Sequence, residues 1–450
     1  MSGRLLLIEA RRTPALWLVL PLVFLCFRTY GDRFTPAIPL WILTSVAIGQ
    51  AATIIGPPVA GIAAWIAGRE RRRGMPELLA TTLYSPLARL LTTWLATTGC
   101  GLLIYGLFAV GGGIVTARGA SWGGLDLWLI LVGAAAIMAY CAIGFAIGVA
   151  LPYRFIAPLV AIGLLVGEWA IGFAIRGHAA LAWLQYLSPV AAPDPTVWFG
   201  GRPAIAPFLI VIYLGFIGAI WFLLSLRLGH FRVAQAWLGL VLAILPAAIG
   251  AAQVSVRVPQ ETTIPGGWYD GMALSPYTPV CRSGPIEVCV HPAYSPWLDE
   301  LAPELNTLLA PLVGISGMPT RAEQVAPNGQ RIGAAPIVPF LLDYRNLYDA
   351  RQYAVDCAVF GCTAGFWPPP APPQVGGPDT RMAIARWLRL RVGDTPEGPY
   401  SRFCAARPGQ DTPCLAAERF AALDPATQQV WLEAHFADLR AGRVTLGELP

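Results

Sequence analysis

The stretch IPLWILTSVAIGQAATIIGPPVAGIAAWIAGRERRRG, Ile38 to Gly74, decides the fold class of this chain. Residues 38–66 contain no charged side chain, and about 20 apolar residues are enough to cross the hydrocarbon core of a bilayer as a helix. Five charged residues then follow without a break, from Arg69 to Arg73. An apolar run that ends in arginines is typical of a membrane span that leaves the bilayer on the cytoplasmic side.

The rest of the first half repeats this pattern. The chain has 450 residues, of which 56% are hydrophobic and only 13% charged, which is too apolar for a soluble fold of this length. We therefore predict a membrane protein. Its expected spans are 14–28, 38–66, 89–115, 125–151, 155–175, 205–226 and 236–254.

The distribution of charge predicts the topology. Residues 1–254 contain 16 Arg and 7 acids, a net charge of +9, and residues 255–450 contain 15 Arg and 19 acids, a net charge of −4. Because the arginines of the first half lie in short loops between spans, they indicate membrane orientation, and nucleic acid is not an expected partner. With the N-terminus in the cytoplasm and the first span an uncleaved anchor, seven spans place residues 255–450 outside. The arginines then expected on the cytoplasmic side are Arg4, Arg11, Arg12, Arg69, Arg71, Arg72, Arg73, Arg89, Arg154, Arg227 and Arg232.

The absence of lysine excludes several kinds of chemistry. All 31 basic residues are Arg. A phosphate-binding P-loop needs its Lys, and so do Schiff-base and pyridoxal-phosphate enzymes. We therefore expect no nucleotide or cofactor site in this chain, and no enzymatic activity of its own.

Cysteine usage supports the same topology. Three cysteines fall inside expected spans, where a buried thiol usually acts as a small hydrophobic side chain. The other six form three close pairs in residues 255–450, and an even number outside the cytoplasm indicates disulfides. We expect nearest-neighbour pairing and no metal, because the chain has no C-x-x-C pair. The six disulfide candidates are Cys281, Cys289, Cys357, Cys362, Cys404 and Cys414.

Local signals predict a folded mixed α/β domain at 255–450. Leucines recur at helical spacing between Trp297 and Val313. A further helix is expected at about 425–440, because Asp424 can cap its start, Pro425 suits its first position, and Gly442 can end it.

The loop after the arginine cluster predicts a short helix at the membrane surface. Gly74 ends the preceding span, Pro76 suits a helix start, and Glu77 favours the helix N-terminus. Ser85 can cap the next helix, with Pro86 as its first residue. The alternative is a positively charged anchor without a partner. The apolar face of the short helix would consist of Met75, Leu78, Leu79 and Leu83.

Residues 56–96 resemble a known arrangement. The segment GPPVAGIAAWIAGRERRRGMPELLATTLYSPLARLLTTWLA is similar to the second span and first cytoplasmic loop of ATP-binding-cassette permeases of the type-2 exporter class. LLLIEARRTPALWLVLPLV, at 5–23, resembles their amphipathic elbow helix and first span. The residues that match the coupling-helix pattern are Arg73, Gly74, Glu77, Leu78, Leu79, Ser85 and Pro86.

This resemblance implies an architecture and a set of partners. It implies an all-α polytopic core of six spans at 1–235, with a coupling helix at about 75–84. A seventh span at 236–254 and a small disulfide-stabilised extracytoplasmic domain at 255–450 depart from the family plan. The resemblance also implies separate cytoplasmic ABC ATPase subunits that bind ATP, a second permease protomer in a homodimer or heterodimer, a bacterial inner membrane, and export of a hydrophobic or amphipathic substrate.

Glu168 is the other candidate site residue. An acid inside a span is energetically costly and marks a functional site by default. Its expected partner is Arg176 or a polar group on another span. In the alternative interpretation it lies near the outer interface and reaches the water there.

Two further functions remain open. The chain could be a non-transporting anchor that displays residues 255–450 as a sensor or binding domain. It could also be an outer-face hydrolase, for which CVHPAY (289–294) and GISG (314–317) are the nearest motifs. With four His and no H-E-x-x-H, the chain lacks a credible catalytic set for the hydrolase.

Overall fold

The structure divides into two compact units, Met1–Gly271 and Met272–Pro450, and each is described by itself. It is a computed structural model, and most of its described residues are helical. The residues that it describes are 14–36, 38–73, 85–120, 122–174, 187, 197–198, 205–227, 244–255, 275–326, 336–342, 348–360, 378–393 and 412–450.

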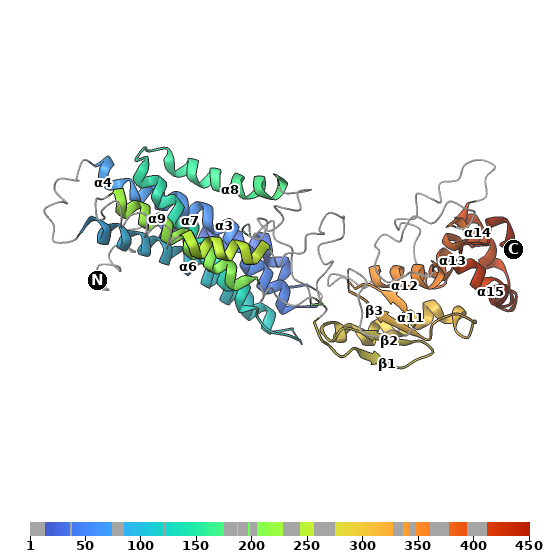
Figure 1. Ribbon diagram of the computed structural model, residues 1–450. Helices are drawn as coiled ribbons and strands as arrows, with labels where there is room; N and C mark the ends of the chain where they lie inside the picture. Colours follow the sequence, from blue (N-terminus) through green and yellow to red (C-terminus); the bar gives the residue numbers. More distant parts are fainter. Residues whose placement is uncertain are drawn as a thin grey trace. The chain divides into compact units, whose positions relative to one another are not determined.

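The first unit is a bundle of long apolar helices that run side by side (Figure 1). Among the described residues, α3, α6, α7 and α9 are long and apolar enough to cross a membrane, and each lies on one of the predicted spans. In chain order the elements are η1 (Pro14–Leu18), α2 (Val19–Tyr30), η2 (Gly31–Arg33), α3 (Trp41–Ala67), α4 (Arg69–Arg72), α6 (Pro86–Ala117), α7 (Leu127–Ala150), α8 (Ile156–Ala174) and α9 (Ala206–Arg227), followed by a shorter apolar helix at Ile244–Ser255.

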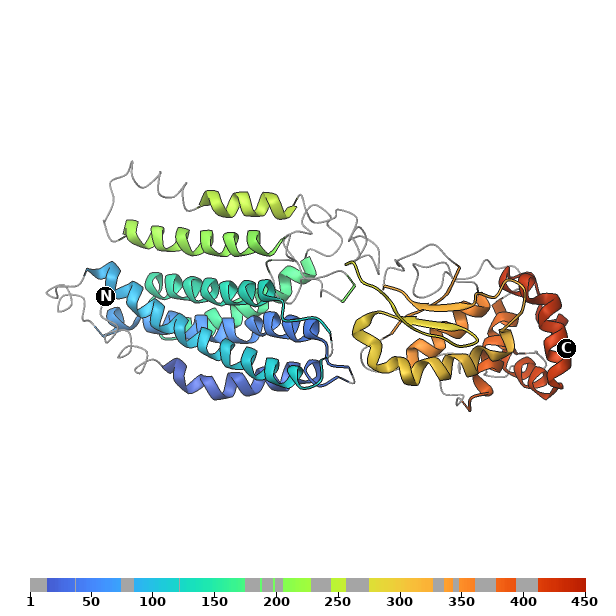
Figure 2. The same ribbon diagram turned by 90° about the horizontal axis from the view of Figure 1, so that it is seen from below.

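Helix α3 lies at the centre of this bundle (Figure 2). In its most apolar 18-residue window 72% of the residues are buried, against 33% for α9, and it packs against α2, α6, α7 and α8. This burial explains its composition. Small residues such as Ala51, Ala52 and Ala60 are fully buried along it, and a central helix surrounded by others has no room for large side chains on every face.

The closest helix contact is a backbone contact between α3 and α7. A Cβ added at Gly144 would overlap the carbonyl oxygen of Ala60, and one added at Gly148 would overlap that of Ala64. The two glycines are four residues apart on α7, and the two alanines are four residues apart on α3. One face of α7 therefore meets one face of α3 at two successive turns. Because lipid tails are as apolar as leucine, close van der Waals packing of this kind is what holds membrane helices together.

Polar side chains fix the ends of these helices. Ser85 accepts a hydrogen bond from the backbone N–H of Ala88 at 3.2 Å, with Pro86 as the first helical residue, so the predicted cap of α6 is confirmed. Asp126 caps α7 by accepting from the N–H of Trp128 at 2.9 Å. Its own N–H donates to the Oγ of Ser45 at 2.9 Å, which ties the start of α7 to α3.

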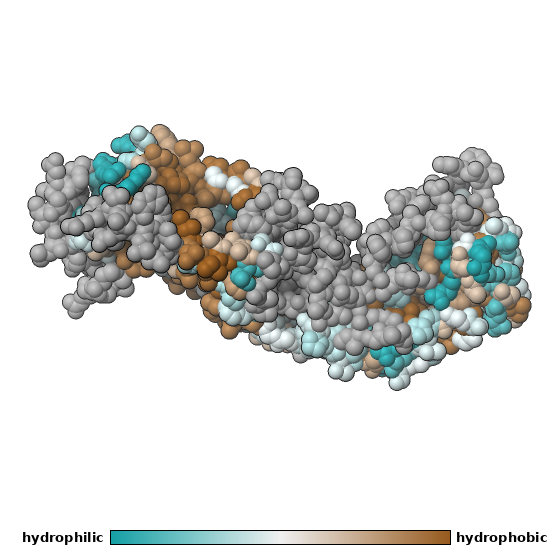
Figure 3. Space-filling view, viewed as in Figure 1, coloured by the Kyte–Doolittle hydropathy of each residue, from teal (hydrophilic) through white to brown (hydrophobic). Residues whose placement is uncertain are grey.

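Much of the visible face of the bundle is apolar (Figure 3). Large hydrophobic side chains are exposed along whole helix faces, which in water would be a strong aggregation hazard. Apolar faces of this length are instead what helices present to lipid. The first unit is therefore a membrane domain. On α6 and α8 the exposed residues include Leu103, Leu107, Val110, Ile114, Leu159, Ile162, Val166 and Trp169.

The second unit contains a four-stranded sheet in the order β1-β2-β3-β4. The strands are β1 (Val280–Arg282), β2 (Glu287–Val290), β3 (Arg321–Gln324) and β4 (Val338–Phe340). Strands β1 and β2 are antiparallel, and β2, β3 and β4 are parallel. The connection from β2 to β3 contains η5 (Pro292–Trp297), α11 (Leu298–Leu309) and η6 (Ala310–Leu312).

Helices complete this unit, and the mixed α/β composition predicted for it is confirmed. They are α12 (Tyr348–Phe360), α13 (Pro378–Leu390), α14 (Pro413–Ala422) and α15 (Pro425–Arg440), with a final turn η8 (Leu446–Glu448). Both predicted helices are present. Asp424 caps α15 by accepting from the backbone of Ala426 and Thr427 at 3.1 Å, and Gly442 follows its end with φ +71°.

The α3–α7 contact predicts the effect of adding one methyl group. Gly144→Ala should destabilise the membrane domain by more than about 2 kcal/mol, because the new Cβ meets backbone that cannot move aside. Gly106→Ala on α6 is the matched control, because a Cβ there meets nothing within 4 Å. Thermal unfolding in lipid nanodiscs measures both. Equal unfolding temperatures for the two variants would contradict the contact.

Candidate functional site

The predicted coupling segment begins and ends at residues that the structure describes. Arg73 is exposed and follows α4 directly, and Ser85 caps α6. The residues between them, including Gly74, Glu77, Leu78 and Leu79, lie outside the described residues. The short helix predicted at 75–84 therefore stays a prediction, while both of its attachment points are defined.

The arginines before this segment bind the ends of neighbouring helices. The guanidinium of Arg71 donates to the carbonyl oxygen of Val149 near the end of α7 at 3.2 Å. Arg72 donates to the carbonyl of Trp65 on α3 and lies over the Trp65 ring, 4.3 Å from its centroid. Cations near helix C-termini are favoured by the unpaired carbonyls and by the helix dipole. The arginine cluster thus connects the ends of α3 and α7, in addition to marking the orientation of the span. The sequence alone did not reveal this connection.

Glu168 lies inside the membrane domain with a partner from another helix. It is 4% exposed, and its Oε1 accepts a hydrogen bond from the hydroxyl of Tyr140 on α7. Its Oε2 receives no hydrogen bond from the part of the chain that the structure describes. The interpretation that Glu168 pairs with a polar group on another span is confirmed for Tyr140, and Arg176 lies outside the described residues. Tyr140 was missed, although a tyrosine in the middle of an apolar span is the signal that could have found it.

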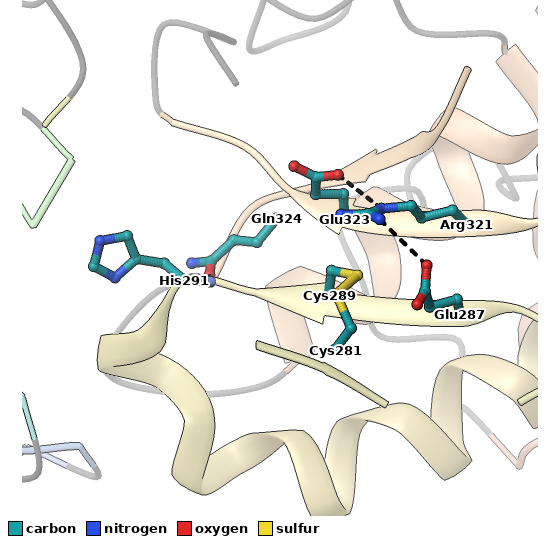
Figure 4. Close-up of a disulfide and its surroundings, with 7 residues drawn as sticks. All are labelled: Cys281, Glu287, Cys289, His291, Arg321, Glu323 and Gln324. Atoms are coloured by element: carbon teal, nitrogen blue, oxygen red, sulfur yellow. Dashed lines mark hydrogen bonds and ion pairs between the residues drawn. A yellow bond between two sulfur atoms is a disulfide. The ribbon is translucent and has the colours of Figure 1, made fainter. Parts of the chain in front are cut away.

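A second polar group lies where the parallel strands of the sheet in the second unit end (Figure 4). His291 directly follows β2, and Gln324 is the last residue of β3; each is 1% exposed. The N–H of His291 donates to Oε1 of Gln324 at 2.9 Å, while Nδ1 of His291 accepts from the N–H of Ala293 at 3.1 Å. The ring of Tyr277 lies 4.6 Å from that of His291. The carboxyl ends of parallel strands are where ligands bind in many α/β domains.

The neighbouring strand positions carry charge. Arg321 donates from Nε to Glu323 at 2.9 Å and from Nη1 to Glu287 on β2 at 3.3 Å (Figure 4). Glu323 is almost fully buried, and its second oxygen receives no hydrogen bond from the described residues. Neither Glu323 nor Gln324 was predicted, because the sequence of β3 does not show which of its polar residues face the interior.

The disulfide prediction is confirmed where the structure describes it. Cys281 and Cys289 form a disulfide between directly paired positions of β1 and β2, with Cα atoms 4.1 Å apart. Cys357 and Cys414 are also disulfide-bonded. Their pairing with Cys362 and Cys404 stays a prediction, because the latter two lie outside the described residues.

The disulfide also decides against a metal at this place. Cys281, Glu287 and Cys289 form the one group of three potential ligands found among the described residues. Metal-binding cysteines act as thiolates, and both sulfur atoms here are in the disulfide. The group therefore offers no thiolate to a metal.

Comparison of the chain with models of protein families, with curated proteins and with solved structures finds no match. The fold and the sites themselves define the class of protein. It is a helical membrane protein that carries a disulfide-containing α/β domain after its membrane helices.

Burial of His291 predicts a pH dependence for the second unit. Burial lowers the pKa of His291 from 6.5 to about 4, so the folded domain favours the neutral ring. The unfolded chain binds a proton from about pH 6.5 downward, and stability should therefore fall as the pH drops from 6.5 toward 4, by about 2–3 kcal/mol. Urea unfolding of this domain in the full-length protein measures the effect, and His291→Gln should remove it. A wild type that is as stable at pH 4.5 as at pH 7 would contradict the burial.

Proposed function

We propose that the chain is the membrane-spanning subunit of an ATP-driven exporter, which couples a separate cytoplasmic ATPase to movement of its helices. The observation that carries this proposal is the way the loop between α3 and α6 is attached. Arg71 and Arg72 fix its start to α7 and α3, and Ser85 fixes its end to α6. A force on the segment at 74–84 therefore reaches three membrane helices at once.

The packing of those helices supports a rigid response. At Gly144 and Gly148 the backbones of α3 and α7 are in direct contact, so the pair should tilt as one body. Domain movements driven by a nucleotide commonly act through such rigid pairs, with the flexible part confined to loops. In this proposal, closure of the ATPase on the short helix at 75–84 tilts α3 with α7 and changes the path for a hydrophobic or amphipathic substrate.

The proposal also requires partners. With no lysine, the chain supplies no P-loop, so two cytoplasmic ATPase chains bind the ATP. A second membrane protomer, identical or homologous, completes the path. Gly163 and Gly167 on α8 support a protomer contact, because a Cβ at either position meets nothing within 4 Å among the residues that the structure describes. Glycines spaced by four residues are common at contacts between membrane helices.

The full topology belongs to the same proposal. It has a six-span core at 1–235 in a bacterial inner membrane, with the N-terminus in the cytoplasm. A seventh span at 236–254 then leads to an outer domain at 255–450. Two observations support it. Arg71, Arg72 and Arg154 lie at one end of α3, α7 and α8. The described disulfides lie in the second unit.

A charge reversal in the short helix tests the coupling. Glu77→Lys should abolish co-purification with the ATPase encoded nearest to this chain, because it places a cation at a predicted helix N-terminus and in the expected contact. Glu70→Lys is the matched control, since it makes the same change seven residues earlier, in α4 and outside the predicted helix. ATP-dependent export in membrane vesicles is the second measurement.

Deletion of residues 75–84 gives the decisive outcome. If the complex still assembles and ATP-dependent export continues without this segment, the proposal is wrong. If both stop while the membrane domain keeps its unfolding temperature, the segment acts as the coupling element rather than as a fold determinant.

A second function is favoured by one observation. The buried polar residues at the carboxyl end of the outer sheet, His291, Glu323 and Gln324, resemble a ligand site more than a plain core. The chain could therefore be an anchor that displays a binding or sensor domain. Ligand binding by the outer domain that survives deletion of residues 75–84, together with no ATPase partner, would favour this function.

A further inference from the structure

The pair formed by Glu168 and Tyr140 lies beside an unusual part of α3. A Cβ added at Gly56 would overlap the ring of Tyr140, so the ring lies directly on the α3 backbone. The next two residues are Pro57 and Pro58, both inside the helix. Proline has no N–H, and these two cannot donate to the carbonyl oxygens of Thr53 and Ile54 one turn earlier. Two carbonyl groups of α3 therefore lack their usual intrahelical donor.

The register of the helices brings Glu168 to the level of these carbonyls. Helix α8 runs antiparallel to α3, and Gly61 of α3 lies against Ala157 and Ala161. The midpoint of Ala157 and Ala161 is position 159. Glu168 lies nine residues further along α8 from that midpoint, and Ala52 lies nine residues back along α3 from Gly61. Residues 52–54 are thus level with the acid. The hydrogen bond to Tyr140, whose ring lies on Gly56, leads independently to the same part of α3.

The polar groups named in this part of the bundle are all oxygen atoms, whose lone pairs favour a proton or a cation as partner. The hydroxyl of Tyr140 donates to Oε1 of Glu168, while Oε2 receives no hydrogen bond from any residue that the structure describes. A buried acceptor without a donor is costly in hydrocarbon. Glu168 is the only Asp, Glu or Arg in the sequences of α3, α7 and α8. The described helices α2, α6 and α9 carry Arg28, Arg89 and Arg227, all near helix ends, and the uncharged titratable side chains on the surrounding helices are Tyr30, Tyr105, Tyr140, Tyr213, Cys26, Cys100 and Cys141.

We propose that Glu168, Tyr140 and the α3 carbonyls before Pro57 and Pro58 form a cation-binding site inside the membrane domain. Its ligand is a proton or a sodium ion. A proton on Oε2 can be donated to a free α3 carbonyl, and a sodium ion can be held between the carboxylate and the same carbonyls. Carboxylates and helix carbonyls that lack intrahelical donors provide the cation sites of many transporters. The bound cation joins α8 to α3 and α7.

The site can be tested without knowledge of the ATPase or the exported substrate. The full-length protein in lipid nanodiscs is unfolded thermally under two series of conditions. In the first, the pH is lowered in choline chloride without sodium. In the second, choline is replaced by sodium at constant ionic strength and high pH. A cation that binds only the folded state raises the unfolding temperature.

Two variants separate the carboxyl group from the packing of its side chain. Glu168→Gln can still accept from Tyr140 and supplies its own N–H to the α3 carbonyl, so it should lose the cation response while remaining folded. Glu168→Asp keeps a carboxyl group and should keep a weakened response. Glu70→Gln makes the same chemical change outside the membrane helices and should respond as the wild type does.

The outcomes are distinct. A wild-type response to low pH alone, absent from Glu168→Gln, identifies a proton site, and infrared spectroscopy should then show a protonated carboxyl band that this variant lacks. A response to sodium at high pH, again absent from Glu168→Gln, identifies a sodium site. If wild type and Glu168→Gln respond equally in both series, or if neither responds, the proposal is overturned. Because no ATPase is present, failure here leaves the export proposal to its own test.

Discussion

The backbone contact between α3 and α7 is the constraint on which the membrane domain depends. Gly144 and Gly148 let α7 approach the carbonyls of Ala60 and Ala64, and this sets α3 as the buried centre around which the other helices pack. In a bilayer the hydrophobic effect does not drive helices together, so such close contacts supply the attraction. This contact positions the residues of the sites described in this domain. Tyr140 reaches Gly56 because α7 already lies against α3, and Arg71 reaches Val149 for the same reason.

The C-terminal end and the middle of α3 have different tasks in this arrangement. At its C-terminal end, Arg71 and Arg72 join the loop that leads to α6 to the ends of α7 and α3. In its middle, Pro57 and Pro58 have no backbone N–H, so two α3 carbonyls at the level of Glu168 lack their usual intrahelical donors. The contact with α7 makes α3 rigid, and the missing N–H groups leave two of its carbonyls without their usual donors beside an acid. These two features suit α3 to the proposed ATPase partner at its end and to the proposed cation at its centre.

The second unit is stabilised by other means. Its sheet is small, and its first two strands are joined by the Cys281–Cys289 disulfide. Small domains with modest cores commonly rely on such links. Buried polar residues at the strand ends, among them His291 and Gln324, are satisfied partly by each other. The interior of this domain therefore contains polar side chains beside its apolar core, which is why a binding function remains a second candidate.

Sequence alone determined the elements that depend on local chemistry. The apolar runs at α3, α6, α7 and α9, the cap at Ser85 and the helix that starts after Asp424 all follow from neighbouring residues, because hydrophobic length and helix capping are local properties. The even cysteine count likewise pointed to disulfides.

Only the tertiary structure decided which distant residues meet. Glu168 could be recognised as costly, but its partner Tyr140 lies 28 residues away, and nothing in either segment specifies that approach. The roles of Arg71, Gly144, Glu323 and Gln324 are of the same kind. A side chain's burial and partner depend on how whole helices and strands pack, and many sequences with the same local pattern could pack differently.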